Sequence, residues 1–286
     1  MNNFKRKRLL KKAISRLLKD DFNGAINIYD KLIMEFKESS IYFLRSTAKK
    51  GLDDFQGAIQ DIDKSIELSP NDAEYYNAKA SLLRERGDLS GALDFFNKAI
   101  DLDNGDDGLY LYRGQLKEDL EDFNSAISDY DKVIELNNSE IEAYIGKGIC
   151  LGRLTQNKEA IETFNKGIEI DPNATELYVN RGIANCRLEE FDNAIKDFEL
   201  ALQVDPNNYF AYYNRARANF DLKNWEKAIT DLDKTIDLNP QYDIAYVLRG
   251  NSKIEIGDKQ GACKDYHIAL DLGRKEVQEN IDEYCK

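Results

Sequence analysis

The stretch YVNRGIANCRLEEFDNAIKDFELALQVDP, Tyr178–Pro206, decides the fold because its pattern recurs along the chain. It contains two amphipathic helical segments separated by a short polar turn. Ala194 gives the clearest phase, since steps of 34 residues in either direction meet an alanine each time. These alanines are Ala58, Ala92, Ala126, Ala160, Ala228 and Ala262, and Ala25 lies 33 residues before the first of them. Self-similarity at such a period predicts a tandem repeat array.

Three further positions keep the same register from residue 39 onward. A tyrosine stands sixteen residues before each repeat alanine, a small residue twelve before it, and a large apolar residue four after it. In the reference repeat these are Tyr178, Gly182 and Phe198. Small residues let the two helices approach, and the large side chains fill the space beside them. The pattern predicts an all-α fold, and the four prolines, Pro70, Pro172, Pro206 and Pro240, mark breaks between repeats.

This register resembles the tetratricopeptide repeat family, whose pattern runs W-x2-L-G-x2-Y, then A-x3-F, then P. The resemblance covers residues 6–276 and implies an α-solenoid, a right-handed superhelix of helix-turn-helix repeats. We expect eight repeats, at residues 6–38, 39–72, 73–106, 107–140, 141–174, 175–208, 209–242 and 243–276. Beyond them, Val277, Ile281 and Tyr284 have helical spacing and predict a C-terminal capping helix at 277–286. Three positions depart from the family pattern: tyrosine stands in place of tryptophan, a basic residue in place of leucine, and the second tyrosine is replaced. The replacing residues are Lys49, Leu83, Lys117, Leu151, Asn185, Asn219 and Lys253.

The basic position is arginine in five repeats, and each arginine has an aspartate sixteen residues later. The pairs are Arg45–Asp61, Arg113–Asp129, Arg181–Asp197, Arg215–Asp231 and Arg249–Asp265. Where the basic residue is lysine (Lys12, Lys79, Lys147), the partner position holds Ile28, Phe95 and Thr163. We therefore expect each arginine to form a charge-assisted pair between the two helices of its repeat. The alternative is an arginine stripe that binds an anionic ligand.

Charge is distributed unevenly along the chain. The net charge is -13, but residues 1–19 contain eight Lys and Arg and no acid, which leaves -21 for the remainder. An acidic body disfavours nucleic-acid binding, which needs clustered basic residues, and fits a basic partner. Residues 1–19 are open to three interpretations: a polar cap on the first repeat, a nuclear-import signal at KRKR, or a helix that lies on an anionic membrane.

Composition also bears on the compartment. No apolar run reaches the roughly 20 residues of a membrane span, and the basic N-terminus lacks the apolar block of a signal peptide. We expect a cytoplasmic protein, with the nucleus as an alternative. The four cysteines, Cys150, Cys186, Cys263 and Cys285, are scattered without a CxxC pair and are predicted to be free thiols.

Residues suited to catalysis or metal binding are scarce. His267 is the only histidine, so no His-based relay or multi-His metal site can be assembled. The glycines Gly146, Gly148 and Gly152 miss the spacing of a nucleotide-binding loop. Gly148 is the small packing residue of its repeat, and the other two suggest a hinge or a close ligand approach. We predict no cofactor, no metal and no enzymatic activity.

The family resemblance implies that the first helices line a concave groove for a peptide or helix of a partner protein. Candidate groove residues are Val179, Asn180, Ile183, Phe210, Tyr213, Asn214, Arg217, Phe220, Val247, Leu248 and Asn251. Any of them could instead pack between adjacent repeats. Asn180 and Asn214 occupy equivalent positions, from which their amides could hold a peptide backbone. Glu74, Glu142 and Glu176 could accept basic residues of the partner.

Some relatives use Lys or Arg beside such asparagines to clamp the C-terminal carboxylate of chaperone tails. Here those positions hold Phe210, Ile244, Asn214 and Leu248, so no carboxylate clamp is expected. The sequence thus favours a non-catalytic scaffold that binds a protein partner, with nucleic acid and membrane as unlikely partners. The alternative is an adaptor tethered to a membrane or a nucleic acid through residues 1–19.

Overall fold

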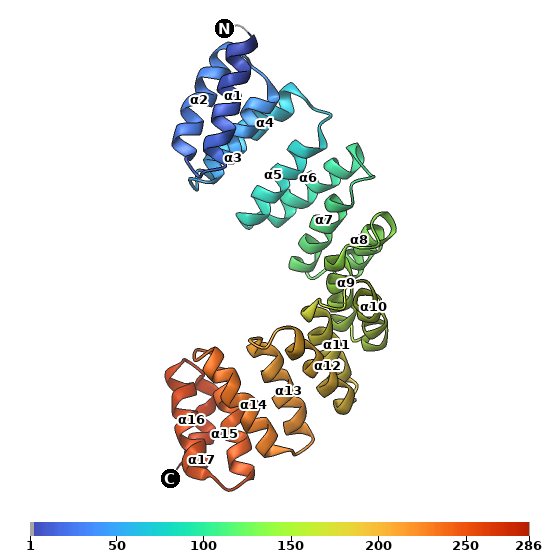
Figure 1. Ribbon diagram of the computed structural model, residues 1–286, viewed down its shortest axis with the longest axis vertical. Helices are drawn as coiled ribbons and strands as arrows, with labels where there is room; N and C mark the ends of the chain where they lie inside the picture. The colour runs from blue at the N-terminus through green and yellow to red at the C-terminus, as the bar shows by residue number, and fades with distance from the viewer. Residues whose placement is uncertain (1–2, 286) are drawn as a thin grey trace. The chain divides into compact units, whose positions relative to one another are not determined.

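The computed structural model describes residues 3–285, and this range contains helices and no β-strand. The chain divides into two compact units, of which the first ends at Asn138 and the second begins at Ser139. Both units consist of helices joined by short connections (Figure 1). None of the helices between residues 3 and 285 is both long and apolar enough to cross a membrane.

The first unit consists of four helix pairs, each joined by a short turn. Its helices are α1 (Asn3–Leu17), α2 (Phe22–Glu35), α3 (Ser39–Lys50), α4 (Phe55–Leu68), α5 (Ala73–Glu85), α6 (Leu89–Leu102), α7 (Asp107–Asp119) and α8 (Phe123–Leu136). Within this unit α2 contacts α3, α4 contacts α5 and α6 contacts α7, so the four pairs stack in tandem.

The second unit repeats this arrangement with four further pairs and a C-terminal segment. Its helices are α9 (Ile141–Arg153), α10 (Asn157–Ile170), α11 (Thr175–Arg187), α12 (Phe191–Val204), α13 (Tyr209–Asp221), α14 (Trp225–Leu238), α15 (Asp243–Glu255), α16 (Lys259–Asp271), η1 (Lys275–Val277) and α17 (Gln278–Tyr284). In the second unit, too, the pairs stack in tandem. The predicted all-α solenoid fold is confirmed.

The turn inside each helix pair is built the same way in all eight described pairs. One residue has left-handed backbone, and only Gly87 and Gly257 among these residues are glycines. The others are Asp20, Asp53, Glu121, Thr155, Glu189 and Lys223, with φ between 57° and 62°. In five pairs an aspartate follows and accepts a hydrogen bond from a backbone N–H in the first turn of the second helix, as Asp54 does from Gly57 at 2.9 Å. These side chains cap the helix N-terminus.

The repeat tyrosine makes two kinds of contact, which explain why it recurs in the pattern. Its ring packs between helices, and in three repeats its hydroxyl donates to the carbonyl of the proline that precedes the helix. Tyr178 donates to Pro172 at 3.1 Å, and Tyr76 and Tyr246 donate to Pro70 and Pro240 in the same way. A carbonyl in the turn between pairs thereby gains a hydrogen-bond partner.

The small repeat residue allows the helices of a pair to approach closely, as the sequence predicts. A Cβ atom on Gly182 would lie 2.6 Å from the Phe198 ring, and one on Gly148 would lie 2.2 Å from the Phe164 ring. Both rings are buried. In these pairs, the interlocking of a glycine on one helix with an aromatic ring on the other therefore forms part of the core.

The C-terminal segment folds back over the last pair. Val277 is buried, and Ile281 and Tyr284 pack against the cluster around Tyr246 and Tyr266. The helix expected at 277–286 is present as η1 and α17, while residue 286 lies outside the described residues. Gly273, whose φ is 104°, allows the turn after α16, as a C-cap glycine does.

Candidate functional site

The five arginine–aspartate pairs predicted from the sequence are all present. In each, Nε and Nη2 of the arginine donate to the aspartate carboxylate on the second helix of the pair. The aspartates are buried, and each guanidinium lies about 5.5 Å from the centroid of its repeat tyrosine ring. The arginines are thus used inside the fold, which disfavours the alternative of an anion-binding stripe.

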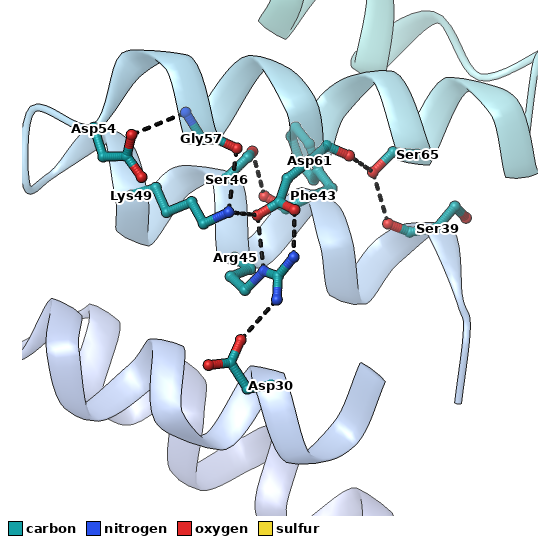
Figure 2. A network of polar contacts seen from close by, with 10 residues as sticks. All are labelled: Asp30, Ser39, Phe43, Arg45, Ser46, Lys49, Asp54, Gly57, Asp61 and Ser65. Carbon is teal, nitrogen blue, oxygen red and sulfur yellow. Dashed lines mark hydrogen bonds and ion pairs between the residues drawn. The ribbon is translucent and has the colours of Figure 1, made fainter. Parts of the chain in front are cut away.

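Figure 2 shows the first of these networks. Arg45 holds both oxygens of Asp61, and its Nη1 donates to Asp30 of the preceding pair at 2.6 Å. Lys49 adds a second cation at 2.8 Å from Asp61. The hydrogen bond to Asp61 raises the pKa of the Arg45 guanidinium above its ordinary value. The link to the preceding pair recurs at Arg113, Arg181 and Arg249, so one guanidinium connects three helices.

Lysine at the same position makes different contacts. Lys79 lies 4.2 Å from the centroid of the Phe95 ring, which occupies the place of the missing aspartate. Its Nζ donates to Asp63 of the preceding pair at 2.5 Å. The aromatic ring therefore substitutes for the carboxylate as the neighbour of the cation.

The predicted groove residues fall into three groups. Val179, Tyr213 and Asn214 are buried between helices and present little surface to a partner. Phe220, Val247, Leu248 and Asn251 are partly buried and pack within the last pairs, where Asn251 accepts a hydrogen bond from Tyr266 at 2.9 Å. Asn180 and Ile183 are also partly buried, and Ile183 packs against the core of its own pair, whereas Phe210 and Arg217 are exposed.

Three of the candidate groove residues meet at one pocket. Asn180 and Ile183 of α11 and Phe210 of α13 line a cavity of about 280 Å³ together with residues of α9 and α10. Its other lining residues are Gly148, Ile149, Gly152, Arg153, Ala160, Phe164, Ala184 and Arg187. We call this cavity the glycine pocket. It lies within the second unit and is lined by the first helices α9, α11 and α13 and by the second helix α10.

Glycine at position 152 creates part of this space. Arg187 lies across it and donates from Nη1 to the Gly152 carbonyl at 3.0 Å, and a Cβ atom on Gly152 would lie 2.6 Å from that nitrogen. Gly148 faces the Phe164 ring as a packing residue, as predicted. The close approach seen at this glycine is made by a side chain of the chain itself, and the suggested hinge or close ligand approach stays a prediction.

The asparagine side chains are partly committed to the helix. Asn180 Nδ2 donates to the Glu176 carbonyl at 2.8 Å, and Asn214 Nδ2 donates to the Phe210 carbonyl at 2.7 Å. Each amide therefore has one N–H engaged one turn earlier on its own helix, while its oxygen keeps its capacity to accept. Burial raises the pKa of Tyr213 beside them above its ordinary value.

Larger hollows lie elsewhere. One of about 610 Å³, between α10 and α12, is lined by Arg181 and Asp197, whose charges are already paired. Another of about 720 Å³ in the first unit is lined by Asp72, Glu74, Asp103 and Asp106. Glu74 is thus part of an acidic surface, whereas Glu142 and Glu176 lie in the first turns of α9 and α11.

The prediction of four free thiols is wrong for two of them. Cys263 of α16 and Cys285, which follows α17, form a disulfide with a Cα–Cα distance of 5.6 Å. The C-terminal segment folds back over α16 and brings together two cysteines that are 22 residues apart. Cys150 and Cys186 are not part of a disulfide. Within residues 3–285, no group of three His, Cys, Asp or Glu side chains could hold a metal ion.

The basic N-terminal segment forms α1, whose inner side packs Ala13 against α2 and whose outer side is charged. Phe4 and Leu18 are exposed, 78% and 79% respectively, and share a helix face with Arg8 and Lys11. Arg6 pairs with Glu38, and Arg16 with Asp21. The predicted segment 1–19 begins two residues before the described range.

Comparison with known proteins agrees with the repeat geometry. Family models described as tetratricopeptide repeat match residues 43–107, 108–140, 141–174, 175–208 and 209–242. The comparison with curated proteins gives no significant match.

Several solved structures are similar to the chain. YrrB, described as a TPR protein with an unusual peptide-binding site, is 28% identical over 64% of this chain and 95% of its own, with a TM-score of 0.52. MamA is 26% identical over 62% and 94%, with a TM-score of 0.52. A tetratricopeptide repeat protein from Parabacteroides merdae is 20% identical over 90% and 99%, with a TM-score of 0.68. Because family models match most of its helix pairs, this chain belongs to the tetratricopeptide repeat family.

Proposed function

We propose that the chain is a non-catalytic scaffold that holds a segment of a partner protein at the glycine pocket of its second unit. The observation that carries this proposal is the convergence of Asn180, Ile183 and Phe210 on one cavity of about 280 Å³. A cavity of about 150 Å³ in another protein accommodates benzene, so this one has room for a large side chain. An apolar side chain in such a pocket is the usual anchor of a protein interface.

Two further observations support a peptide as the ligand. The Asn180 oxygen can accept a hydrogen bond from an extended backbone beside the anchor. YrrB, 28% identical to this chain, is described as having an unusual peptide-binding site. The partly exposed Phe210 ring at the pocket edge offers apolar surface to the residues that follow the anchor.

Selection from a random peptide library tests this proposal. The immobilised full-length chain should enrich peptides with a large apolar residue, and Ile183→Asp should weaken their binding at least tenfold by placing a charge in the pocket wall. Leu200→Asp is the matched control, because Leu200 is partly exposed on α12 outside the glycine pocket. A library that yields no binder, or binders indifferent to Ile183→Asp, contradicts the proposal.

A second candidate function is attachment to an anionic membrane through α1. Phe4, Arg8, Lys11 and Leu18 combine basic and exposed apolar side chains on one face, which is the composition of a helix that lies in a membrane interface. Full-length protein should bind vesicles containing phosphatidylserine, and the Arg8→Glu/Lys11→Glu variant should not. Equal binding of both proteins, or binding to RNA and not to vesicles, contradicts this function.

A further inference from the structure

Two arginines at the glycine pocket lack acidic partners. Arg153 ends α9 and Arg187 ends α11, and both line the pocket. Neither forms an ion pair with any residue of the described range 3–285, although the chain carries 53 Asp and Glu. The hydrogen bond from Arg187 Nη1 to the Gly152 carbonyl uses one of its five N–H groups.

Helix stability alone does not account for this pair. A basic residue in the last turn complements the helix dipole, but the equivalent positions of four other repeats hold the acids Glu85, Asp119, Asp221 and Glu255, and the first two repeats hold Leu18 and Gly51. In the first unit, two of these acids join neighbouring pairs: Lys50 bonds Glu85 at 2.6 Å, and Arg84 bonds Asp119 at 2.7 Å. The fold therefore tolerates an acid at this position. In the two repeats that contribute Arg153 and Arg187 to the pocket, the charge at this position is positive instead.

The absence of a side chain at Gly152 makes room for the Arg187 guanidinium. The equivalent position in other repeats holds larger side chains, namely Lys50, Arg84, Glu118, Cys186, Phe220 and Ile254. Because glycine has no side chain here, the Arg187 guanidinium can lie against α9 beside the pocket. Gly152 is the penultimate residue of α9, where glycine is a weaker helix former than alanine, so this arrangement comes with some cost in helix stability.

We propose that the glycine pocket selects an acidic segment of the partner, in which a large apolar side chain is flanked by a carboxylate. The apolar side chain enters between Ile183 and Phe164, and the carboxylate is bound by Arg153 and Arg187 at the edge. Guanidinium groups bind carboxylates through paired hydrogen bonds, which gives geometric as well as charge selectivity. This inference rests on the proposed peptide-binding function and specifies the partner's charge at that site.

The site differs from the carboxylate clamp of chaperone-binding relatives. The clamp positions hold Phe210, Ile244, Asn214 and Leu248, none of which is basic. Here the basic groups come from the C-terminal ends of α9 and α11. The charge also differs from the basic partner that the acidic body of the chain suggests, because the arginines act locally at the pocket.

The experiment uses the peptides enriched by the full-length chain, measured by fluorescence anisotropy at low and high salt. These peptides should carry Asp or Glu beside the apolar residue, and higher salt should weaken their binding to the chain. Arg153→Gln and Arg187→Gln should each weaken binding about tenfold, as expected for one charged hydrogen-bonded contact. Arg187→Lys should restore part of the loss, and the Arg153→Glu/Arg187→Glu variant should prefer peptides with Lys or Arg instead.

Two controls separate the site from general effects. Lys196→Gln removes an exposed charge from α12 and should leave binding unchanged. Gly152→Ala should displace Arg187 and weaken the binding of acidic peptides. The thermal stability of the variant should equal or exceed that of the wild type. Enriched peptides that need Ile183 but show no acidic residue, or that keep their affinity in both Arg→Gln variants, overturn this inference and leave the scaffold proposal intact. A library without any Ile183-dependent binder refutes both.

Discussion

Arg181 of α11 donates to both carboxylate oxygens of Asp197 on α12, at 2.5 and 3.1 Å. Asp197 is buried, and Asn185 donates to its second oxygen at 2.8 Å. The remaining Arg181 nitrogen, Nη1, donates to Asn165 of the preceding pair at 2.6 Å. Because the same guanidinium bonds to α10 and α12, it joins the two helices of one repeat to each other and to the repeat before.

Replacing Arg181 with leucine, the residue of the family pattern, should lower the free energy of unfolding by about 3 kcal/mol. The reason is that the Asp197 carboxylate stays buried without its main cation. The double variant Arg181→Leu/Asp197→Leu should lose much less than the sum of the single losses, since both charges are removed together. Urea denaturation of the four proteins measures this coupling.

A coupling free energy near zero would contradict the pairing. Arg217→Leu provides the control, because Arg217 is exposed on the neighbouring helix α13 and has no equivalent aspartate contact. Its free energy of unfolding should stay within about 0.5 kcal/mol of the wild-type value.

The repeat pattern was sufficient to predict the helices and the arginine–aspartate pairs. Each depends on residues that recur at fixed spacing, so one copy checks another. Arg181 and Asp197 could be paired from the sequence because the same two residue types recur together in four other repeats. The additional hydrogen bond from Arg181 to Asn165 was not predicted. The residue that accepts this bond on the preceding pair is an aspartate in some repeats and an asparagine in others.

Features that belong to a single repeat could not be read in this way. Val179, Tyr213 and Asn214 were selected by position, yet the structure buries them because the next first helix packs over that side. Arg153 and Arg187 were not selected, although the change of sign at one register position was visible in the sequence. The Cys263–Cys285 disulfide depends on how the C-terminal segment folds back, which the repeat pattern does not describe.

The left-handed turn residues predict opposite effects for two substitutions. Thr155 has φ of 62° and is β-branched, so Thr155→Gly should raise the free energy of unfolding by about 0.5 to 1 kcal/mol. Gly257 has φ of 86°, and Gly257→Ala should lower it by about 1 kcal/mol. A Cβ atom at Gly257 would meet no atom within 4 Å, so the expected loss comes from the backbone conformation and not from a steric clash. Urea denaturation that shows the same sign for both would contradict this account of the turns.

Cys186 should react slowly with alkylating reagents. Burial raises the pKa of its thiol to about 11, whereas an ordinary cysteine has a pKa near 8.5. The neutral form thus persists at pH 8, where only about 0.1% is thiolate, and the rate should fall more than a hundredfold below that of an exposed cysteine. Peptide mapping after iodoacetamide treatment between pH 7 and 9.5 should show a tenfold rise per pH unit. A rate that levels off near pH 8.5 would contradict the effect of burial on the pKa. The alkylation rate of Cys186 in urea-unfolded protein serves as the reference.

Opening the Cys263–Cys285 disulfide should loosen the C-terminal segment while the helix pair beneath it stays folded. The disulfide closes a loop that contains η1 and α17, and the lost constraint is worth up to about 3 kcal/mol for a loop of this length. Amide exchange in Gln278–Tyr284 should therefore speed up by as much as a hundredfold on treatment with a dithiol reductant. The packing of Val277 and Ile281, with the Arg274–Asp243 bonds at 2.9 and 3.2 Å, limits the opening.

The Cys285→Ser variant without reductant should reproduce the fast exchange, whereas Cys186→Ser should not. Exchange within α11 and α12 serves as the internal control, since the segment packs against α16. Unchanged exchange in the reduced protein would mean that apolar packing alone holds α17 against α16. The disulfide would then be a consequence of that packing and not a cause of the docked conformation.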